Sequence, residues 1–371
     1  MRGVAEARVT AERWIEEVLV DLGERAYAVV VGEDVLDDVG RRTAALGFAG
    51  RAGLVTSERV GALYAARVVA SLRAAGLDPV VVTMPDGEEH KTLARLGTVQ
   101  DRLLAAGLDR RSPVVALGGG VVTDLAGFAA ATLLRGLPTV LVPTTLVGQV
   151  DAAIGGKTAV NHAQGKNLIG VFHQPRLVLA DVGVLATLSA REFAAGLAEV
   201  VKYGAIGNAE LFRGLETDLD AVLGRDPGRL APVVAACSRQ KAAVVVEDER
   251  EERGGRAVLN FGHTVGHALE AATGYRRFLH GEAVAIGMVA AARISARLGR
   301  CGAEVGDRIA RLLMRAGLPT EIPGNVSREA LVDAVQRDKK SRGGRIRFVC
   351  IEEIGRTGFV DLSGQEIVSG L

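Results

Sequence analysis

The chain has 371 residues, of which 48% are hydrophobic and 24% are charged, and its formal net charge at pH 7 is +1. This length allows two domains with sizeable cores, and the near-zero net charge argues against a main function in coating nucleic acid or an anionic membrane. The N-terminus, MRGVAEARVTAERWIEE, lacks the apolar stretch of a signal peptide, and the three cysteines show no C-x-x-C spacing. We therefore expect a cytoplasmic protein with reduced thiols and no membrane-spanning helix.

The first half of the chain alternates short β-branched runs with longer helical patterns. The predicted strands are 26–32, 52–56, 79–83, 113–117 and 139–142. The predicted helices are 34–46, 59–75 and 92–108. This alternation is typical of βαβ units, which form a parallel sheet with helices on both faces and bind ligands at the carboxyl ends of the strands.

Beyond about residue 188 the pattern becomes helical. Helices are predicted at 190–203, 210–223, 230–246, 264–273, 281–298 and 308–316, and a late strand is predicted at 346–350. We place a domain boundary near residues 187–189, so that an α/β domain (1–187) precedes a helical domain (188–371). A cleft between two such halves is the usual place for a site.

A glycine-rich turn, Gly118-Gly119-Gly120, follows an apolar strand and precedes an apolar helix. Glycines let the backbone approach a ligand closely, and the N-terminus of the following helix offers N–H groups to a pyrophosphate. The spacing is not G-x-G-x-x-G, and such turns also occur without a nucleotide. Dinucleotide binding and a plain structural turn both remain open.

Three of the six histidines, His263, His267 and His280, fall in one short stretch. The first two lie four residues apart on one helix face, and the third can return from the next turn or helix. Imidazoles suit zinc or a similar divalent ion, and a catalytic zinc site often adds a carboxylate, for which Glu199 is the best candidate. The alternative is a pair of surface or capping histidines.

Several basic residues stand beside glycine or apolar residues instead of other charges. They are Arg135, Lys157, Lys166 and Lys202. Together with Asp151, such a group would suit a small substrate that carries phosphate and carboxylate. Taken singly, each lysine is better explained as an ordinary solvated side chain.

Read together, several segments resemble the sugar phosphate cyclases, and among them the 3-dehydroquinate synthase family most closely. These segments, in the family's order, are 118–136, 143–175, 191–204, 247–251, 256–275, 279–288 and 337–349. The resemblance implies a Rossmann-like NAD-binding N-terminal domain and an all-α C-terminal domain that binds metal and substrate. It also implies a homodimeric lyase of the shikimate pathway, which converts 3-deoxy-D-arabino-heptulosonate 7-phosphate to 3-dehydroquinate and phosphate and recycles NAD in each turnover.

The resemblance further implies roles for individual residues. The metal, Zn2+ or Co2+, would be held by Glu199, His263 and His280. The catalytic residues would be Asp151, Lys157, Lys202, Lys241, Arg256, Asn260 and His267. The substrate would also be bound by Lys166, Asn167, Lys339 and, from across a dimer interface, Arg135. NAD would contact Glu88, Lys91, Gly119, Gly120, Asp124, Thr144, Thr145, Lys157, Lys166 and Thr187.

Other functions share parts of this pattern. Aminodehydroquinate synthase, 2-epi-5-epi-valiolone synthase and 2-deoxy-scyllo-inosose synthase have the same frame, but the sequence GGKTAVNH followed by GKN resembles the dehydroquinate synthases better than the last two. The amino variant remains open. A metal-dependent polyol or glycerol phosphate dehydrogenase would release NADH at each turnover, and a non-catalytic scaffold is a third alternative.

Overall fold

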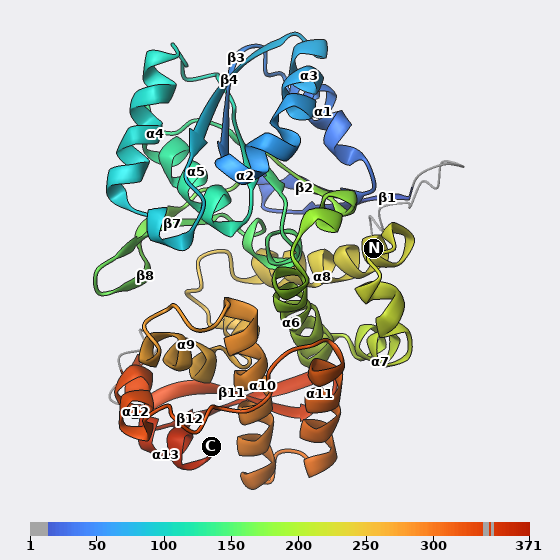
Figure 1. The fold of residues 1–371 in the computed structure, drawn as a ribbon, viewed down its shortest axis with the longest axis vertical. Helices are drawn as coiled ribbons and strands as arrows, with labels where there is room; N and C mark the ends of the chain where they lie inside the picture. The colour runs from blue at the N-terminus through green and yellow to red at the C-terminus, as the bar shows by residue number, and fades with distance from the viewer. Residues whose placement is uncertain (1–13, 337–340, 343–344) are drawn as a thin grey trace. The chain divides into compact units, whose positions relative to one another are not determined.

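The computed structural model describes residues 14–336, 341–342 and 345–371 (Figure 1). It divides into two compact units, which are described separately. Unit 1 comprises Met1–Leu188 and Pro227–Arg250, and unit 2 comprises Ser189–Asp226 and Glu251–Leu371. Within the described ranges, none of the helices combines the length and the apolar character needed to cross a membrane. The predicted substrate residue Lys339 lies outside these ranges.

Unit 1 is built on a seven-stranded sheet in the order β1-β2-β9-β6-β5-β3-β4. Its strands are β1 (Ile15–Val20), β2 (Tyr27–Gly32), β3 (Gly50–Ser57), β4 (Leu77–Met84), β5 (Val114–Gly118), β6 (Thr139–Pro143) and β9 (Leu177–Asp181). Only β1 runs antiparallel to its neighbour, and the other pairings are parallel. The parallel sheet predicted from the sequence is confirmed, and the pattern analysis missed β1 and β9.

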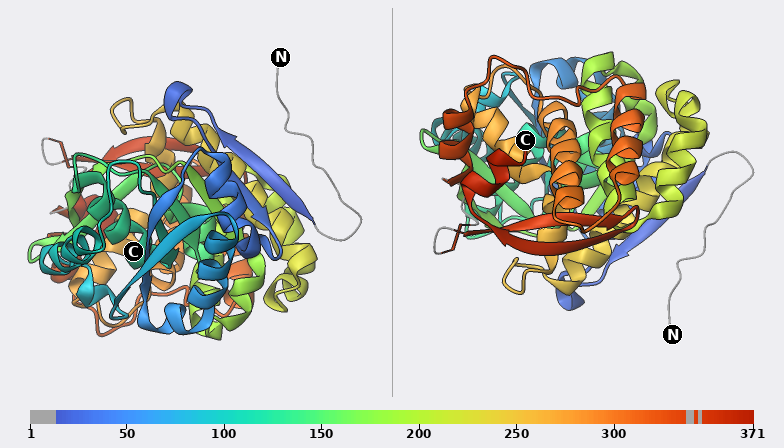
Figure 2. Two further views of the ribbon diagram at one scale, coloured as in Figure 1. Left: turned by 90° about the horizontal axis from the view of Figure 1, so that it is seen from above. Right: turned by 90° about the horizontal axis from the view of Figure 1, so that it is seen from below.

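Helices cover both faces of this sheet (Figures 1 and 2). They are α1 (Val39–Ala45), α2 (Glu58–Val60), α3 (Ala66–Ala74), α4 (Leu93–Ala105) and α5 (Gly120–Thr132). Unit 1 also contains the short 3-10 helices η1 (Gly23–Arg25), η2 (Val35–Asp38), η4 (Glu88–His90) and η6 (Val182–Thr187) and the π-helical segments η3 (Gly61–Ala65) and η5 (Gly148–Ala152). In β3, Leu54 belongs to the apolar core that also holds Leu72 of α3. A Cβ on the preceding Gly53 would lie 2.6 Å from Leu103 of α4, so consecutive residues face opposite helix layers.

A hairpin follows β6 where the sequence suggested a loop. It consists of β7 (Lys157–His162) and β8 (Gly165–Phe172), which pair antiparallel. The hairpin packs on α5, because a Cβ on Gly127 would lie 2.5 Å from Cγ2 of Thr158. The predicted residues Lys157, Lys166 and Asn167 are therefore carried on the two strands of a hairpin.

The helix α8 (Pro227–Glu247) belongs to unit 1 and packs against β1 and β2. Ion pairs fasten it there: Arg239 pairs with Glu16 of β1, and Glu249 accepts from Arg25 with an Nη2–Oε2 distance of 2.6 Å. The predicted boundary at residue 187 assigned this helix to the second domain, but in the structure α8 belongs to unit 1. Periodicity shows that a helix has an apolar face, but it does not show what that face packs against.

Unit 2 is mainly helical, as predicted. Its helices are α6 (Ala190–Gly207), α7 (Ala209–Leu223), α9 (His263–Ala272), α10 (His280–Arg297), α11 (Ala303–Arg315), α12 (Arg328–Gln336) and α13 (Gly364–Ser369), with the turn η7 (Gly255–Asn260). It also contains an antiparallel sheet of β10 (Ser341–Arg342), β11 (Arg345–Glu353) and β12 (Arg356–Leu362), so it is not all-α. The strand β11, which includes the predicted strand 346–350, packs against α10 (Figure 2).

Candidate active site

Glycine brings the backbones of α6 and α10 into contact in unit 2. A Cβ on Gly281 would lie 1.8 Å from the carbonyl oxygen of Ala195, a distance that no side chain tolerates. Gly281 directly follows His280, and Ala195 precedes Glu199 by about one helical turn. This contact therefore sets how closely the two predicted metal ligands approach each other.

The start of α9 is held against α10 in the same way. A Cβ on Gly287 would lie 1.9 Å from the carbonyl oxygen of Gly262, which itself has a φ of +78°. Gly262 precedes the first residue of α9, His263. Two glycine contacts thus place the ligand-bearing ends of α9 and α10.

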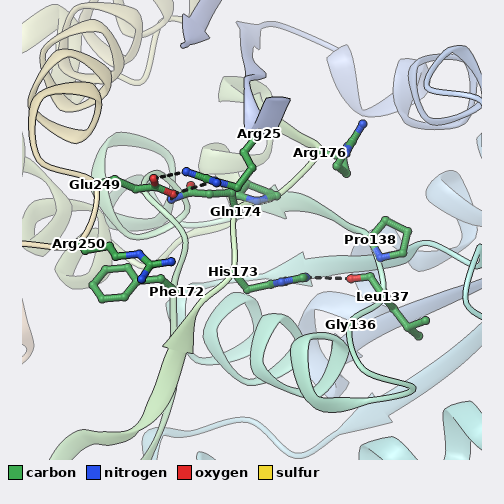
Figure 3. Close-up of a pocket in the computed structure, with 11 residues that line it drawn as sticks. Arg25, Gly136, Leu137, Pro138, Phe172, His173, Gln174, Arg176, Glu249 and Arg250 are labelled. Carbon is green, nitrogen blue, oxygen red and sulfur yellow. Dashed lines mark hydrogen bonds and ion pairs between the residues drawn. The ribbon is translucent and has the colours of Figure 1, made fainter. Parts of the chain in front are cut away.

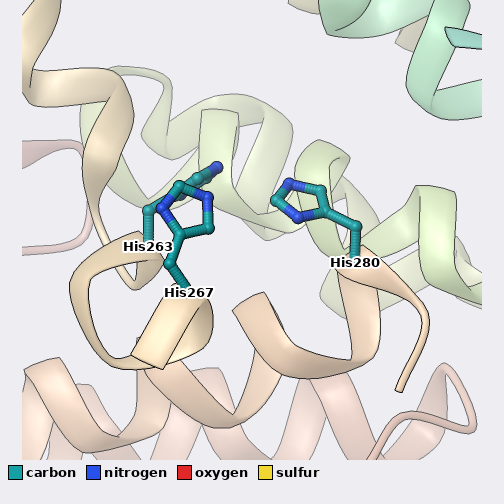
Figure 4. Close-up of side chains that lie close together, drawn as sticks. All are labelled: His263, His267 and His280. Atoms are coloured by element: carbon teal, nitrogen blue, oxygen red, sulfur yellow. The ribbon is translucent and has the colours of Figure 1, made fainter. Parts of the chain in front are cut away.

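Three histidine rings converge at these helix ends (Figure 4). The ring centroids of His263 and His267 lie 5.2 Å apart, and that of His280 lies 5.2 Å from His263 and 5.7 Å from His267. One ring nitrogen from each lies within 4.8 Å of the others. Oε1 of the buried Glu199 is 3.5 Å from Nε2 of His263 and 3.4 Å from Nε2 of His280. Two imidazoles and a carboxylate form a donor set that fits Zn2+ or Co2+.

The other ring nitrogens are anchored to oxygen atoms. Nδ1 of His263 lies 3.1 Å from the carbonyl oxygen of Phe261, and Nδ1 of His280 lies 3.3 Å from Oε2 of Glu270. Because a carbonyl or carboxylate oxygen only accepts, each Nδ1 carries the proton and donates. Both Nε2 atoms then face Glu199, which is the arrangement that metal-binding histidines adopt.

The electrostatics of this cluster favour a cation. Burial lowers the pKa of His263 well below 6.5, so that this ring is neutral. Burial acts on His280 in the same direction, but hydrogen bonds to Glu199 and Glu270 outweigh it and raise the pKa to about 10. Without a metal, a proton on His280 therefore supplies the positive charge that the two carboxylates require, and a divalent ion would displace that proton.

Two further cations predicted from the sequence are buried in unit 2. Lys202 is fully buried, and its Nζ pairs with Oε2 of Glu199. Arg256, on η7, is 1% exposed and lies 4.0 Å from a carboxylate oxygen of Glu251. Buried cations are rare unless they have a partner, and Lys202 lies directly beside the proposed metal ligand. The neighbouring predicted residue Asn260, at the end of η7, is partly buried.

The glycine turn of unit 1 lies at the carboxyl ends of the adjacent strands β5 and β6. The backbone N–H of Thr144 donates to the carbonyl oxygen of Gly118 over 3.0 Å. A Cβ on Gly119 would lie 2.8 Å from Cγ2 of Thr145, whereas one on Gly120 would meet nothing closer than 3.7 Å. Gly119 is thus required by its neighbour, while a Cβ at Gly120 would make only an ordinary contact; Gly120 begins α5, whose N-terminus can receive phosphate.

A hydrogen-bond network joins four residues predicted to contact the cofactor or substrate. Nζ of the buried Lys91 lies 2.5 Å from Oδ2 of Asp124 and 2.6 Å from Oδ1 of Asn167. Burial raises the pKa of Asp124, and Lys91 opposes that shift. Asn161 donates to Oε1 of Glu88 over 2.7 Å and accepts from the N–H of Asn167 over 2.9 Å. Asn161 was not among the residues predicted from the sequence, because an asparagine in a strand carries no signal of its own.

The remaining predicted residues of unit 1 lie in several settings. Lys241 of α8 is 7% exposed and pairs with Asp151 of η5. Lys157 is exposed at the start of β7, and the hydroxyl of Thr187 lies 2.8 Å from that of Tyr64. Lys166 is partly buried on β8, and Arg135 is exposed in the turn after α5.

Glu270, which is 2% exposed, was not among the residues predicted from the sequence. It follows His263 by seven residues and His267 by three, so the three side chains share a face of α9. That spacing was available in the sequence and would have identified Glu270 as part of the cluster.

A hollow in unit 1 contains none of the predicted site residues (Figure 3). Its volume is roughly 340 Å³, and its lining residues are Arg25, Gly136, Leu137, Pro138, Phe172, His173, Gln174, Pro175, Arg176, Glu249 and Arg250. The carboxylate of Glu249 accepts from both Arg25 and Gln174. These contacts tie the segment that follows α8 to η1 and to the segment between β8 and β9, so the hollow lies where these segments of unit 1 meet.

Comparison with known proteins gives the same assignment for both parts of the chain. Residues 81–195 match the family model described as 3-dehydroquinate synthase N-terminal, and residues 196–341 match the one described as 3-dehydroquinate synthase C-terminal. The chain is 50% identical over 350 residues to the 3-dehydroquinate synthase of Pelobacter propionicus, covering 94% of this chain and 97% of that protein. It is also 50% identical to the one from Caulobacter vibrioides, with 92% and 94% covered.

Solved structures agree on the fold. A 2-deoxy-scyllo-inosose synthase, complexed with carbaglucose-6-phosphate, NAD+ and Co2+, matches with a TM-score of 0.87 and 27% identity over 96% of this chain and 99% of that one. The 2-epi-5-epi-valiolone synthase of Streptomyces hygroscopicus, with NAD+ and Zn2+ bound, matches with a TM-score of 0.85 and 29% identity over 100% and 98%. From the family matches over most of its length, this chain belongs to the 3-dehydroquinate synthase family.

Proposed function

We propose that this protein is a 3-dehydroquinate synthase, a lyase that converts 3-deoxy-D-arabino-heptulosonate 7-phosphate to 3-dehydroquinate and phosphate in the shikimate pathway. The observation that carries the proposal is the convergence of Glu199, His263 and His280 in a chain that is 50% identical to such a synthase over 94% of its length. The ligand types are those of a catalytic metal site, and so are the hydrogen bonds that Nδ1 of each histidine makes to an oxygen atom.

We assign a divalent metal to Glu199, His263 and His280, and NAD to the residues around the glycine turn of unit 1. When bound, NAD supplies a hydride acceptor that is regenerated within each turnover, and the metal supplies a Lewis acid that lowers the pKa of a substrate hydroxyl. The cofactor residues are Glu88, Lys91, Gly119, Gly120, Asp124, Thr144, Thr145, Lys157, Lys166 and Thr187. NAD+ with Co2+ or Zn2+ in the two related synthases supports this assignment.

The cations of unit 2 then bind and orient an anionic substrate. Lys202 and Arg256 are held rigidly by burial, so little conformational entropy is lost when they bind oxygen atoms of a phosphate or carboxylate. His267 is less buried than His263 and faces the same cluster, which suits a group that takes up or delivers a proton at its ring nitrogen. Asn260, at the end of η7, would complete the binding of substrate hydroxyls.

In unit 1 we assign substrate contacts to residues on η5, α8 and the β7–β8 hairpin. They are Asp151, Lys157, Lys166, Asn167 and Lys241, with Lys339 outside the described residues. The pairing of Lys241 with Asp151 orients both groups before a ligand arrives, which is the condition for catalysis by positioning. A homodimer in which Arg135 reaches the partner's substrate, and a cytoplasmic location, complete the proposal.

The test is an assay of the purified protein with NAD+ and Co2+. With 3-deoxy-D-arabino-heptulosonate 7-phosphate we expect phosphate release without accumulation of NADH, because the hydride returns to the product within each turnover. The amino analogue of this substrate and sedoheptulose 7-phosphate, run in parallel, separate the other cyclases. Phosphate release from one of these two alone, or a steady rise of NADH absorbance, would refute the proposal.

A second cyclase function has one observation in its favour, namely the TM-score of 0.87 to a 2-deoxy-scyllo-inosose synthase. The sequence identity to that synthase is 27%, compared with 50% to the 3-dehydroquinate synthases. A shared fold carries many chemistries, so the higher identity over nearly the whole chain favours dehydroquinate synthesis.

A further inference from the structure

We infer that Glu270 is a positioning residue for the metal, which holds the His280 ring in the tautomer and orientation that turn Nε2 toward Glu199. The inference rests on the metal site proposed above and adds a residue to which neither the family resemblance nor the comparisons assign a role. The observation behind it is the 3.3 Å contact between Oε2 of Glu270 and Nδ1 of His280.

The two imidazole ligands differ in how their orientation is secured. The side chain of His263 is 9% exposed, so packing restrains its ring, and its Nδ1 donates to a neutral carbonyl oxygen. The side chain of His280 is 35% exposed, so packing restrains its ring less. The hydrogen bond to Glu270 therefore has to provide the restraint that burial provides for His263.

The position of Glu270 is unfavourable for stability alone. Its side chain is 2% exposed, and removing a carboxylate from water is costly. It also lies in the last turn of α9, which ends at Ala272, where the helix dipole disfavours a negative charge. A neutral side chain would cost less free energy at this position, so we attribute the charge of Glu270 to its contact with His280.

The carboxylate does two things there. It accepts the Nδ1 proton of His280, and because a neutral imidazole carries one proton on only one nitrogen, Nε2 would then present its lone pair to a metal held with Glu199. It also adds a second negative charge to a cluster that already holds Glu199 and the cation of Lys202. Both effects strengthen the binding of a divalent cation without a bond from Glu270 to the metal.

The experiment measures metal affinity on chelator-treated protein by competition between the protein and a chromophoric chelator for Co2+ and Zn2+. For Glu270→Gln, whose side-chain oxygen can still accept from Nδ1 but carries no charge, we expect affinity to fall about 10- to 100-fold. The visible bands of the Co2+ form should keep their positions, because the ligands are unchanged. Glu270→Asp keeps the charge and should bind more tightly than Glu270→Gln.

Glu216→Gln is the matched control, since Glu216 pairs with Arg308 of the same unit over 2.6 Å. It removes the same carboxylate charge from a pair that contains none of the histidines and should leave metal affinity unchanged within twofold. Affinity within twofold of wild type in Glu270→Gln, shifted Co2+ bands, an equal loss in Glu216→Gln, or Glu270→Asp no tighter than Glu270→Gln would each overturn the inference. Failure of the wild-type protein itself to bind Co2+ or Zn2+ would instead refute the proposed metal site.

Discussion

Replacing Gly281 by alanine should separate the two helices that carry Glu199 and His280. The new Cβ would lie 1.8 Å from the carbonyl oxygen of Ala195, and contacts below 3.0 Å are essentially never seen, so α10 must move by at least about 1.2 Å, the difference between the two. Overpacking of this kind costs about 1–3 kcal/mol, and a backbone oxygen cannot rotate away as a side chain can. We therefore expect destabilisation at the upper end of that range.

The same shift should weaken metal binding. The Nε2–Oε1 distance between His280 and Glu199 is 3.4 Å, and metal–ligand distances tolerate changes of only about 0.2 Å. We expect Gly281→Ala to bind Co2+ at least about 100-fold more weakly, equivalent to roughly 2.7 kcal/mol. The measurement is competition with a chromophoric chelator, together with thermal unfolding of the metal-free protein.

Gly214→Ala is the matched control, because Gly214 lies inside α7 of the same unit and a Cβ at this position would meet nothing within 4 Å. This change should raise stability by about 0.5–1 kcal/mol and leave Co2+ affinity unchanged. If Gly281→Ala bound Co2+ as tightly as wild type and unfolded at the same temperature, the argument that glycine contacts position the ligands would be wrong.

Three further predictions test the site and its surroundings. Glu199→Ala should abolish tight Co2+ binding while His267→Ala retains it; the reverse order would assign the metal to the three histidines. Lys91→Met, which leaves Asp124 without its ion pair, should weaken NAD+ binding at least about tenfold in calorimetry, and unchanged affinity would remove this network from the cofactor site. Burial tends to raise the pKa of Glu282, but the hydrogen bonds that its carboxylate accepts outweigh burial and lower the pKa below 4.5. The ionised carboxylate therefore stabilises the fold above pH 4.5, and this stabilisation is lost as the pH falls through the lowered pKa. The difference in melting temperature between metal-free wild type and Glu282→Gln should accordingly vanish in acid, and a constant difference would contradict this linkage.

Local patterns in the sequence were enough to predict the parallel sheet and most helices. β-Branched runs such as 113–117 and apolar spacing such as that of 92–108 report how each segment buries its own face, and the structure places β5 and α4 there. The histidine stretch was visible because residues four apart on a helix must share a face, and the glycine turn was visible because glycines between a strand and a helix let the backbone approach a ligand. The spacing of Glu270 carried the same information.

Other features depended on contacts between distant segments, which no local pattern encodes. The packing of α8 on β1, the resulting division into units and the bridge that Asn161 makes to Glu88 all join residues far apart in the chain. The sequence by itself determined which side chains are available for metal, cofactor and substrate. Only the tertiary structure decided which of them meet, because an approach such as that of Gly281 to Ala195 depends on the packing of two helices and not on the propensity of either.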